Sequence, residues 1–274
     1  MSMQAAVIQM NAGADRDANL AQAAHWLRAA AAAGARLAVL PENFACMGTR
    51  ETDKLALAEV DGSGPIQDFL ATQARTLSLW IVGGTIPLAV PGEAGRVFAA
   101  CGVWNARGER VARYDKIHLF DIEVPDGSGE RYRESATIAP GAPVPVVVDT
   151  PLGRLGLSVC YDLRFPELYR RLLAQGAELL CVPSAFTART GEAHWEILLR
   201  ARAVENLCHV LASNQCGTHG GGRRTWGHSC IIDPWGRVLG DAGDAPGIVV
   251  ADVDAAARDA TRRRFPVLDH RRLS

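Results

Sequence analysis

The chain has 274 residues, of which 48% are hydrophobic and 22% are charged, a composition typical of folded globular proteins and unlike that of disordered ones. Its 29 basic and 30 acidic residues leave a formal net charge of −1, so the molecule has no overall positive field to attract nucleic acid or an anionic membrane. We therefore expect a small-molecule substrate and no nucleic-acid partner.

The N-terminal residues and the cysteines indicate which cellular compartment the protein occupies. Residues 1–10 contain no basic segment and turn polar at Gln4 and Gln9, unlike a secretory or organellar targeting sequence. The sequence contains no run of 18 uncharged apolar residues, so we expect no membrane span. The seven cysteines lack short paired spacings, which favours free thiols over a disulfide framework or a zinc site. We expect a cytoplasmic protein with no membrane attachment, no metal and no cofactor.

Strand-like apolar runs alternate with helical patterns through the first half of the chain. In chain order we expect a strand over 5–10, a helix over 19–33, a strand over 37–40, a helix over 65–77, and strands over 79–85, 97–104 and 110–114. Residues 105–108 join the last two strands as a hairpin turn. A polar, glycine-containing loop over roughly 118–135 follows, and its length predicts a functional segment.

The second half repeats this alternation. We expect strands over 144–148 and 154–159, a helix over 166–175, a strand over 177–182, a helix over 192–206, and strands over 208–213, 226–233 and 248–253. Ten or more strands are too many, for only four or five helices, to form a single sheet that helices cover on both faces. The pattern predicts an α/β protein in which two sheets pack face to face with helices outside, as one domain over residues 1–274.

The strongest local signal lies around Cys160. An apolar run ends at this cysteine and Pro166 opens a helix six residues later, so the thiol is expected on a sharp strand-to-helix turn. Such a turn exposes a nucleophile and leaves backbone N–H groups free beside it. A cysteine that only packs at the end of a strand is an equally open interpretation. The other six cysteines are expected to pack in the core.

Two charged residues occupy similar positions after strands. Glu42 follows the apolar run 37–40, where apolar neighbours would raise the pKa of its carboxyl group and suit it to act as a base. A surface carboxylate is the plain alternative. Lys116 follows the strand 110–114, and it is one of only two lysines among 29 basic residues, which indicates a need for a compact ammonium. The other lysine, Lys54, lies in a polar helical stretch, and its presence is interpreted as chance.

Three segments, in this order, resemble the signature motifs of the nitrilase, or carbon–nitrogen hydrolase, superfamily. They are Leu-Pro-Glu42-Asn, Tyr-Asp-Lys116-Ile-His-Leu-Phe-Asp and Val-Cys160-Tyr-Asp-Leu-Arg-Phe-Pro-Glu. The resemblance covers essentially the whole chain. It implies a four-layer α-β-β-α sandwich, a Glu-Lys-Cys triad, and pairing into a homodimer or a higher homo-oligomer, with a C-terminal segment over about 254–274 available for subunit contact. It also implies a second glutamate that holds the lysine and the substrate, a position that Glu134 matches.

Secondary segments resemble the branch of this superfamily that contains the deaminated glutathione amidases. These segments span residues 119–125, 184–187, 190–195, 200–205, 227–229 and 233–236. The resemblance implies hydrolysis of a linear non-peptide amide through a thioester, with deaminated glutathione giving 2-oxoglutarate and Cys-Gly. An ω-amidase acting on 2-oxoglutaramate is a close alternative.

The expected mechanism assigns a role to each motif residue. Glu42 would accept the thiol proton of Cys160, while the Lys116 ammonium and the backbone N–H of Tyr161 would stabilise the oxyanion. Glu42 would then protonate the leaving amine and activate the water that hydrolyses the thioester. This reaction needs no cofactor.

Three further residues are candidates for binding the substrate. Arg164 could bind a substrate carboxylate through two parallel hydrogen bonds, although an ion pair with Glu167 is an open alternative. Phe186 and Thr187 are implied by the resemblance to line the pocket.

A cysteine–histidine hydrolase of the papain type is the first rival hypothesis. His118, His194 or His228 would then be the base for the cysteine, since each lies near a motif. No local signature of a cysteine protease is present, and Glu42 and Lys116 would have no role. A metal site is disfavoured because the sequence lacks His-Glu-x-x-His and paired Cys-x-x-Cys patterns.

Two arginine-rich segments raise different hypotheses. A non-enzymatic protein could bind acidic partners or nucleic acid through the arginines at 262–264, 271 and 272, although a solvated helix face or a subunit contact is the commoner role of such residues. The run Gly-Gly-Gly-Arg-Arg over 220–224 lacks the ending of a phosphate-binding loop, and we interpret it as a flexible loop.

Overall fold

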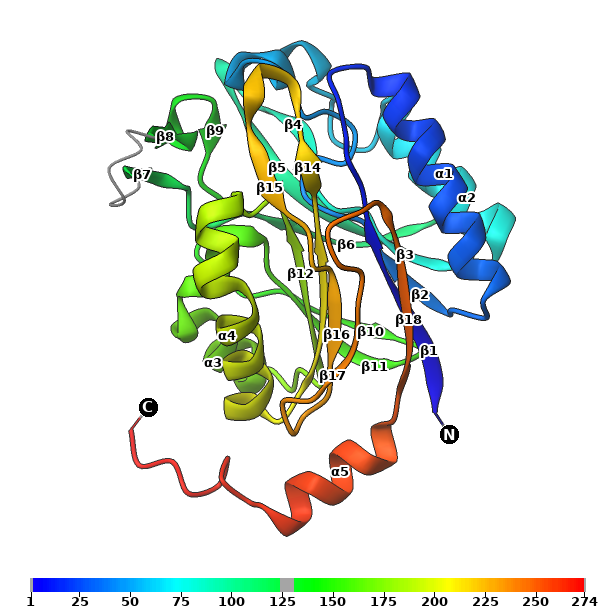
Figure 1. The fold of residues 1–274 in the computed structure, drawn as a ribbon, viewed down its shortest axis with the longest axis vertical. Coiled ribbons are helices and arrows are strands. Elements are labelled where there is room, and N and C mark those ends of the chain that lie inside the picture. The colour runs from blue at the N-terminus through cyan, green and yellow to red at the C-terminus, as the bar shows by residue number, and fades with distance from the viewer. Residues whose placement is uncertain (1, 124–130, 274) are drawn as a thin grey trace.

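The structure is a computed structural model that describes residues 2–123 and 131–273, and its strands form two large sheets (Figure 1). In the described residues the first sheet runs in the order β18 (Gly247–Val253), β1 (Met3–Gln9), β2 (Leu37–Val39), β3 (Trp80–Val82), β5 (Glu93–Trp104) and β4 (Ile86–Val90), with β6 (Arg110–Asp115) and β9 (Ile138–Ala139) also paired to β5. The second sheet runs in the order β10 (Val147–Thr150), β11 (Gly153–Leu157), β12 (Leu179–Ser184), β13 (His209–Asn214), β16 (Cys230–Ile232) and β17 (Val238–Asp241). Two small hairpins are formed by β7 (Asp121–Glu123) with β8 (Arg131–Arg133) and by β14 (Cys216–Thr218) with β15 (Arg224–Trp226).

The helices begin where the sequence supplies a suitable first residue. Proline opens α2 and α3, because its missing N–H has no partner at that position in any helix. Asp15 caps α1, and its side chain accepts a hydrogen bond from the N–H of Ala18 at 3.0 Å. The α-helices are α1 (Arg16–Ala32), α2 (Pro65–Leu77), α3 (Pro166–Ala174), α4 (Ala188–Asn206) and α5 (Ala255–Arg264), and the 3-10 helices are η1 (Glu51–Leu57), η2 (Glu134–Ala136), η3 (Cys160–Arg164) and η4 (Gly220–Gly222).

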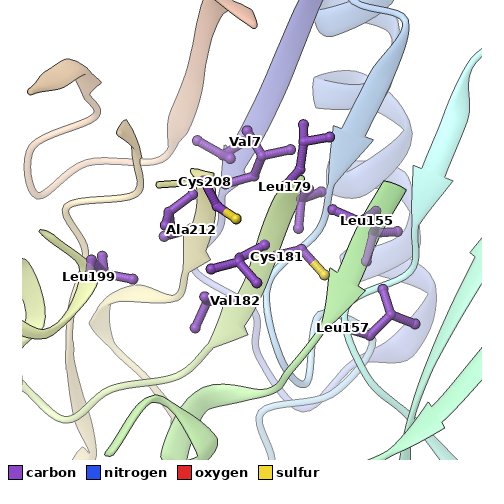
Figure 2. Packing of buried hydrophobic residues seen from close by; sticks show 14 of the residues in the cluster. Val7, Leu155, Leu157, Leu179, Cys181, Val182, Leu199, Cys208 and Ala212 are labelled. Carbon is purple, nitrogen blue, oxygen red and sulfur yellow. The ribbon is translucent and has the colours of Figure 1, made fainter. Parts of the chain in front are cut away.

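Each sheet has one face against the other sheet and one face under helices. On β1, Val7 packs between the sheets, whereas Ile8 lies under α1 and α2, as the two-residue period of a strand requires. Helices α3 and α4 cover the outer face of the second sheet (Figure 1). Figure 2 shows Val7 in the same apolar cluster as Leu155 and Leu179 of the second sheet. The predicted four-layer α-β-β-α sandwich is confirmed.

The expected elements are present, with ends shifted by a few residues and some exceptions. The strand expected over 226–233 starts only at Cys230, because Gly227 and His228 adopt positive φ angles of 78° and 54° that no strand accommodates. Strand β4 was not predicted, and it contains Pro87, which cannot donate to a ladder. The expected functional loop contains the β7–β8 hairpin, and residues 124–130 of it lie outside the described residues.

The C-terminal arginines do not all lie on a solvated face. Arg262, near the end of α5, donates from Nε to the carbonyl oxygen of Leu207 at 3.0 Å and from Nη2 to that of Ala177 at 3.3 Å. Arg262 therefore ties α5 to the second sheet layer and is not part of a solvated face, while the alternative of a subunit contact stays a prediction. No helix in residues 2–123 and 131–273 is long and apolar enough to cross a membrane.

Candidate active site

Glu42 lies just beyond the end of β2, on a turn that its neighbours hold in place. The N–H of Asn43 donates to Thr85 Oγ1 at 2.9 Å, which ties this turn to the segment after β3. Gly84, at φ 54°, packs so closely that a Cβ atom would lie 2.0 Å from the carbonyl oxygen of Pro41. The Glu42 carboxylate is thus fixed at the edge of the first sheet, and only 3% of the residue is exposed.

Lys116 follows β6 and is enclosed by two carboxylates. Its Nζ donates to Glu42 Oε1 at 2.7 Å and to both carboxylate oxygens of Glu134 at 2.8 and 2.9 Å. The N–H of Phe120 also donates to Glu134 at 2.6 Å, which fixes the second carboxylate. Lys116 is 1% exposed, so these bonds are not weakened by water.

Cys160 occupies the expected turn between β11 and α3. It is the first residue of η3 and has a φ of 48°, in the left-handed region that non-glycine residues seldom adopt. Its thiol is buried, and the charge of the nearby Glu42 carboxylate raises the pKa of this thiol. Glu42, Lys116, Glu134 and Cys160 therefore converge at one place, and we call them the inner cluster.

Asp162 connects the turn of Cys160 to the strand end that carries Lys116. Its carboxylate accepts hydrogen bonds from the Tyr114 hydroxyl at 2.7 Å, from the N–H of Val159 at 2.9 Å and from the N–H of His118 at 3.1 Å. The Nδ1 atom of His118 also lies 2.7 Å from Asp162 Oδ1. Asp162 is fully buried, so this one carboxylate fixes the residues flanking both Lys116 and Cys160.

The inner cluster has a definite charge state. Burial alone would raise the pKa of Glu42, but the charge of Lys116 and its hydrogen bond outweigh burial, and the pKa lies below its ordinary value. The expectation of a raised Glu42 pKa is therefore wrong. Burial alone would lower the pKa of Lys116, but Glu134 and Glu42 raise it well above its usual range. Burial and the charge of Glu42 raise the pKa of the Cys160 thiol, so the sulfur is protonated at neutral pH.

A cavity that is open to solvent leads onto the inner cluster. Tyr161, Phe186 and Thr187 line it, as the sequence predicts. Tyr161 is the second residue of η3, where a backbone N–H has no acceptor within its own helix. This N–H can therefore bond to a group held beside Cys160.

Arg164 lies behind the wall of this cavity. Its guanidinium carbon is 5.7 Å from the ring centre of Tyr161 and 5.3 Å from that of Phe186. Its Nη1 donates to His194 Nδ1 at 3.2 Å. The alternative ion pair with Glu167 is not formed in the described structure. Arg164 is thus stacked on two rings of the site and does not line the cavity itself.

Two cations that do line the cavity, Lys54 and Arg223, were not predicted from the sequence. Lys54 projects from η1 into the wall of the cavity, a position that the sequence interpretation did not give it. The scarcity of lysine in the chain was the signal that could have identified it. The glycine run before Arg223 forms η4, and a Cβ atom on Gly221 would lie 2.7 Å from the backbone oxygen of Thr49. Gly221 and Gly222 are exposed, and the flexibility expected of this loop stays a prediction.

The histidines of the rival hypothesis do not face Cys160. His118 bonds to Asp162, and His228 Nδ1 lies 3.1 Å from the carboxylate of Asp241. None of His118, His194 and His228 lines the cavity. In the described parts of the chain, no group of three His, Cys, Asp or Glu side chains could hold a metal ion.

Comparison with known proteins gives a consistent result. Residues 4–263 match the family described as carbon-nitrogen hydrolase. The deaminated glutathione amidase of Synechocystis is 45% identical over 268 residues, which cover 97% of each chain. The human deaminated glutathione amidase is 41% identical over 97% of this chain and 81% of its own length.

Solved structures share the fold. The NitFhit protein of Caenorhabditis elegans superposes with a TM-score of 0.92 at 37% identity, over 99% of this chain, and this chain spans 65% of that structure. An amidase from Nesterenkonia sp. AN1 superposes with a TM-score of 0.79 at 30% identity, over 96% of this chain and 98% of that one. That structure is a glutamate-to-glutamine variant in which acrylamide has undergone Michael addition at the active-site cysteine.

A four-layer sandwich with a buried carboxylate, ammonium and thiol at one cavity defines a hydrolase of the nitrilase class. The chain belongs to the carbon-nitrogen hydrolase family, and it is an enzyme that hydrolyses carbon–nitrogen bonds of amides.

Proposed function

We propose that the protein is a cysteine-dependent amidase that hydrolyses deaminated glutathione to 2-oxoglutarate and Cys-Gly. The observation that carries the proposal is the convergence of Glu42, Lys116 and Cys160 in one cavity, with Lys116 Nζ 2.7 Å from Glu42. The activity named for the relatives from Synechocystis and human supports the choice of substrate.

In the proposed first half-reaction, Glu42 takes the thiol proton of Cys160 as the sulfur attacks the amide carbonyl carbon. A neutral thiol next to an ionised carboxylate is the charge state that this transfer requires. The ammonium of Lys116 and the N–H of Tyr161 stabilise the oxyanion. Glu42 then donates its proton to the leaving nitrogen, so that the C–N bond breaks and a thioester remains.

In the second half-reaction, Glu42 takes a proton from water, whose oxygen attacks the thioester carbonyl. The C–S bond breaks and the proton returns to the sulfur, so the enzyme is restored. Glu134 holds Lys116 from the other side through two hydrogen bonds. It keeps the ammonium fixed while Glu42 changes its charge.

The remaining candidate residues bind the substrate in this proposal. Phe186 and Thr187 form the wall beside the sulfur. Arg164, stacked behind Phe186, would reach one of the two substrate carboxylates after a change of its side-chain rotamer.

We also propose a cytoplasmic homodimer or higher homo-oligomer. Seven free, buried cysteines suit a reducing compartment. Exposed apolar residues gather on the outer layer of α4 and the segments near α5, where a second subunit would cover them. They are Ile197, Val204, Trp235 and Phe265.

The test compares the hydrolysis of deaminated glutathione, 2-oxoglutaramate and a short nitrile. We expect the highest kcat/KM on deaminated glutathione. Cys160→Ala should abolish turnover, and Lys116→Arg should lower kcat by about 10²- to 10³-fold, because the broad guanidinium cannot replace a compact oxyanion donor. Thermal unfolding of both variants checks that they fold. Undiminished activity of Cys160→Ala would remove the nucleophile assignment, and a higher kcat/KM on 2-oxoglutaramate would make the protein an ω-amidase.

A further inference from the structure

The wall of the cavity is divided by charge. The inner cluster, with its thiol neutral, carries two carboxylates and one ammonium, a net charge of −1. The outer wall contains Lys54, Arg133, Arg223 and Glu51, which are three cations and one anion with a net charge of +2. This gradient suits a molecule that places a neutral amide at the inner end and an anionic group at the outer end.

Arg223 holds its guanidinium at this outer end through two of its five N–H donors. Its Nη1 donates to Glu51 at 3.2 Å and its Nη2 to the carbonyl oxygen of Ala185 at 3.4 Å. Its Nε is buried and has no hydrogen-bond partner in the described structure. A buried N–H without an acceptor is costly, and a ligand oxygen would reach it only after the side chains that enclose it have moved.

An anionic side chain of the protein already bridges the two cations. Glu51 accepts from Lys54 Nζ at 2.8 Å through one oxygen and from Arg223 through the other. The Glu51 side chain is 44% exposed, whereas that of Lys54 is 14% exposed. The cations are therefore held in the wall, and the carboxylate between them can move into water.

Arg223 lies close to the reacting sulfur. Ala185 lines the cavity together with Cys160, and its carbonyl oxygen accepts a hydrogen bond from Arg223. Ala185 thus joins the wall beside the sulfur to the guanidinium. A short acyl chain bound at Cys160 can place a terminal carboxylate there.

We infer that Arg223, assisted by Lys54, binds the carboxylate of the acyl half of the substrate, and that Glu51 occupies this position until the substrate displaces it. The inference rests on the proposed function only in placing the reacting amide at Cys160. The 2-oxoglutaryl half of the proposed substrate carries such a carboxylate at the far end of a short acyl chain.

The first test compares an acidic amide with a neutral one of equal length. For Arg223→Met we expect kcat/KM on 2-oxoglutaramate to fall by about 10- to 100-fold, mainly through KM, as for the loss of a charge-assisted hydrogen bond. Activity on pentanamide should change by less than about 3-fold on the same grounds. The matched control Arg224→Met removes an exposed arginine from the adjacent position and should change neither activity.

The second test removes the competing anion. Glu51→Gln keeps the size of the side chain but not its charge, so KM for 2-oxoglutaramate should fall by about 3- to 10-fold while pentanamide is unaffected. Equal losses on both amides in Arg223→Met would reduce Arg223 to a structural role and overturn the inference. A loss confined to deaminated glutathione would move the contact to the leaving half and also overturn it.

A binding measurement separates this inference from the proposed function. Glutarate carries the carboxylate but has no amide to cleave, so calorimetric titration with glutarate needs no turnover. We expect its Kd to rise by about 10-fold or more in Arg223→Met and to stay unchanged in Arg224→Met. Inactivity toward every amide would refute the proposed function alone, whereas an unchanged Kd in Arg223→Met would refute the carboxylate site alone.

Discussion

The two ends of the cavity are built in different ways. The inner cluster stands mainly at strand ends, with Glu42 after β2, Lys116 after β6 and Cys160 after β11, and the bonds of Lys116 within it are 2.7 to 2.9 Å long. The outer end stands on the 3-10 helices and turns that carry Lys54 and Arg223, and its ion pairs reach water. The inner end is therefore held by both sheets, whereas the outer end can adjust. Changes at the inner end should alter kcat, and changes at the outer end should alter KM.

The largest effect is expected for Glu42→Gln, which removes the proposed base. The value of kcat should fall by about 10²- to 10⁴-fold. The pKa of the Cys160 thiol should fall as well, because the carboxylate that repels a thiolate is gone while Lys116 remains. The difference in ultraviolet thiolate absorbance between this variant and the double variant with Cys160→Ala measures that pKa. An unchanged or higher pKa would show that Glu42 does not oppose the thiolate.

An intermediate effect is expected for Asp162→Asn. This variant tests whether the geometry of the inner end depends on the hydrogen bonds that the Asp162 carboxylate accepts. Asparagine keeps the size of the side chain but cannot accept all the bonds that Tyr114, His118 and Val159 donate. We expect the free energy of unfolding to fall by about 1 to 3 kcal/mol, and kcat to fall by about 10-fold with KM little changed. Asp233→Asn, in a surface turn, is the control. A destabilised Asp162→Asn enzyme with normal kcat would mean that Asp162 serves stability alone.

The smallest effect is expected at the outer end, for Lys54→Met. Its ammonium is partly neutralised by Glu51, so KM for an acidic amide should rise by only about 3- to 10-fold with kcat unchanged. Lys54→Arg keeps the charge and should restore most of the affinity. Steady-state kinetics on 2-oxoglutaramate measures both variants. A change in kcat for Lys54→Met would show that the two ends are not independent.

The sequence was informative about the inner end because its residues follow apolar strands. The carboxyl ends of neighbouring strands meet at one edge, so a glutamate after the strand 37–40 and a cysteine after the strand 154–159 could be expected to come together. The charge state could not be read in the same way. The pKa of Glu42 depends on Lys116, 74 positions away in the chain, and this pairing exists only after the sheets have packed.

The residues of the outer end could not be predicted, because short 3-10 helices and turns produce no periodic pattern in the sequence. In the sequence, Lys54 lies in a polar stretch with a helical pattern. Only the packing of η1 directs its side chain toward the cavity. Arg223 follows three glycines, which suggest a flexible loop, and only the fold places its guanidinium in the cavity wall. Long-range contacts of this kind are absent from local sequence patterns.

The pairing of β1 with β18 means that the first sheet can be completed only at the end of synthesis. These strands are joined antiparallel over seven residue pairs, from Met3 with Val253 to Gln9 with Gly247, although almost the whole chain separates them. A ribosome releases β1 early, and its outer edge then lacks its partner until residues 247–253 have been synthesised. An open, apolar strand edge is prone to pair with other chains. Nascent chains stalled before residue 247 should therefore require chaperones, and should aggregate where the finished protein does not.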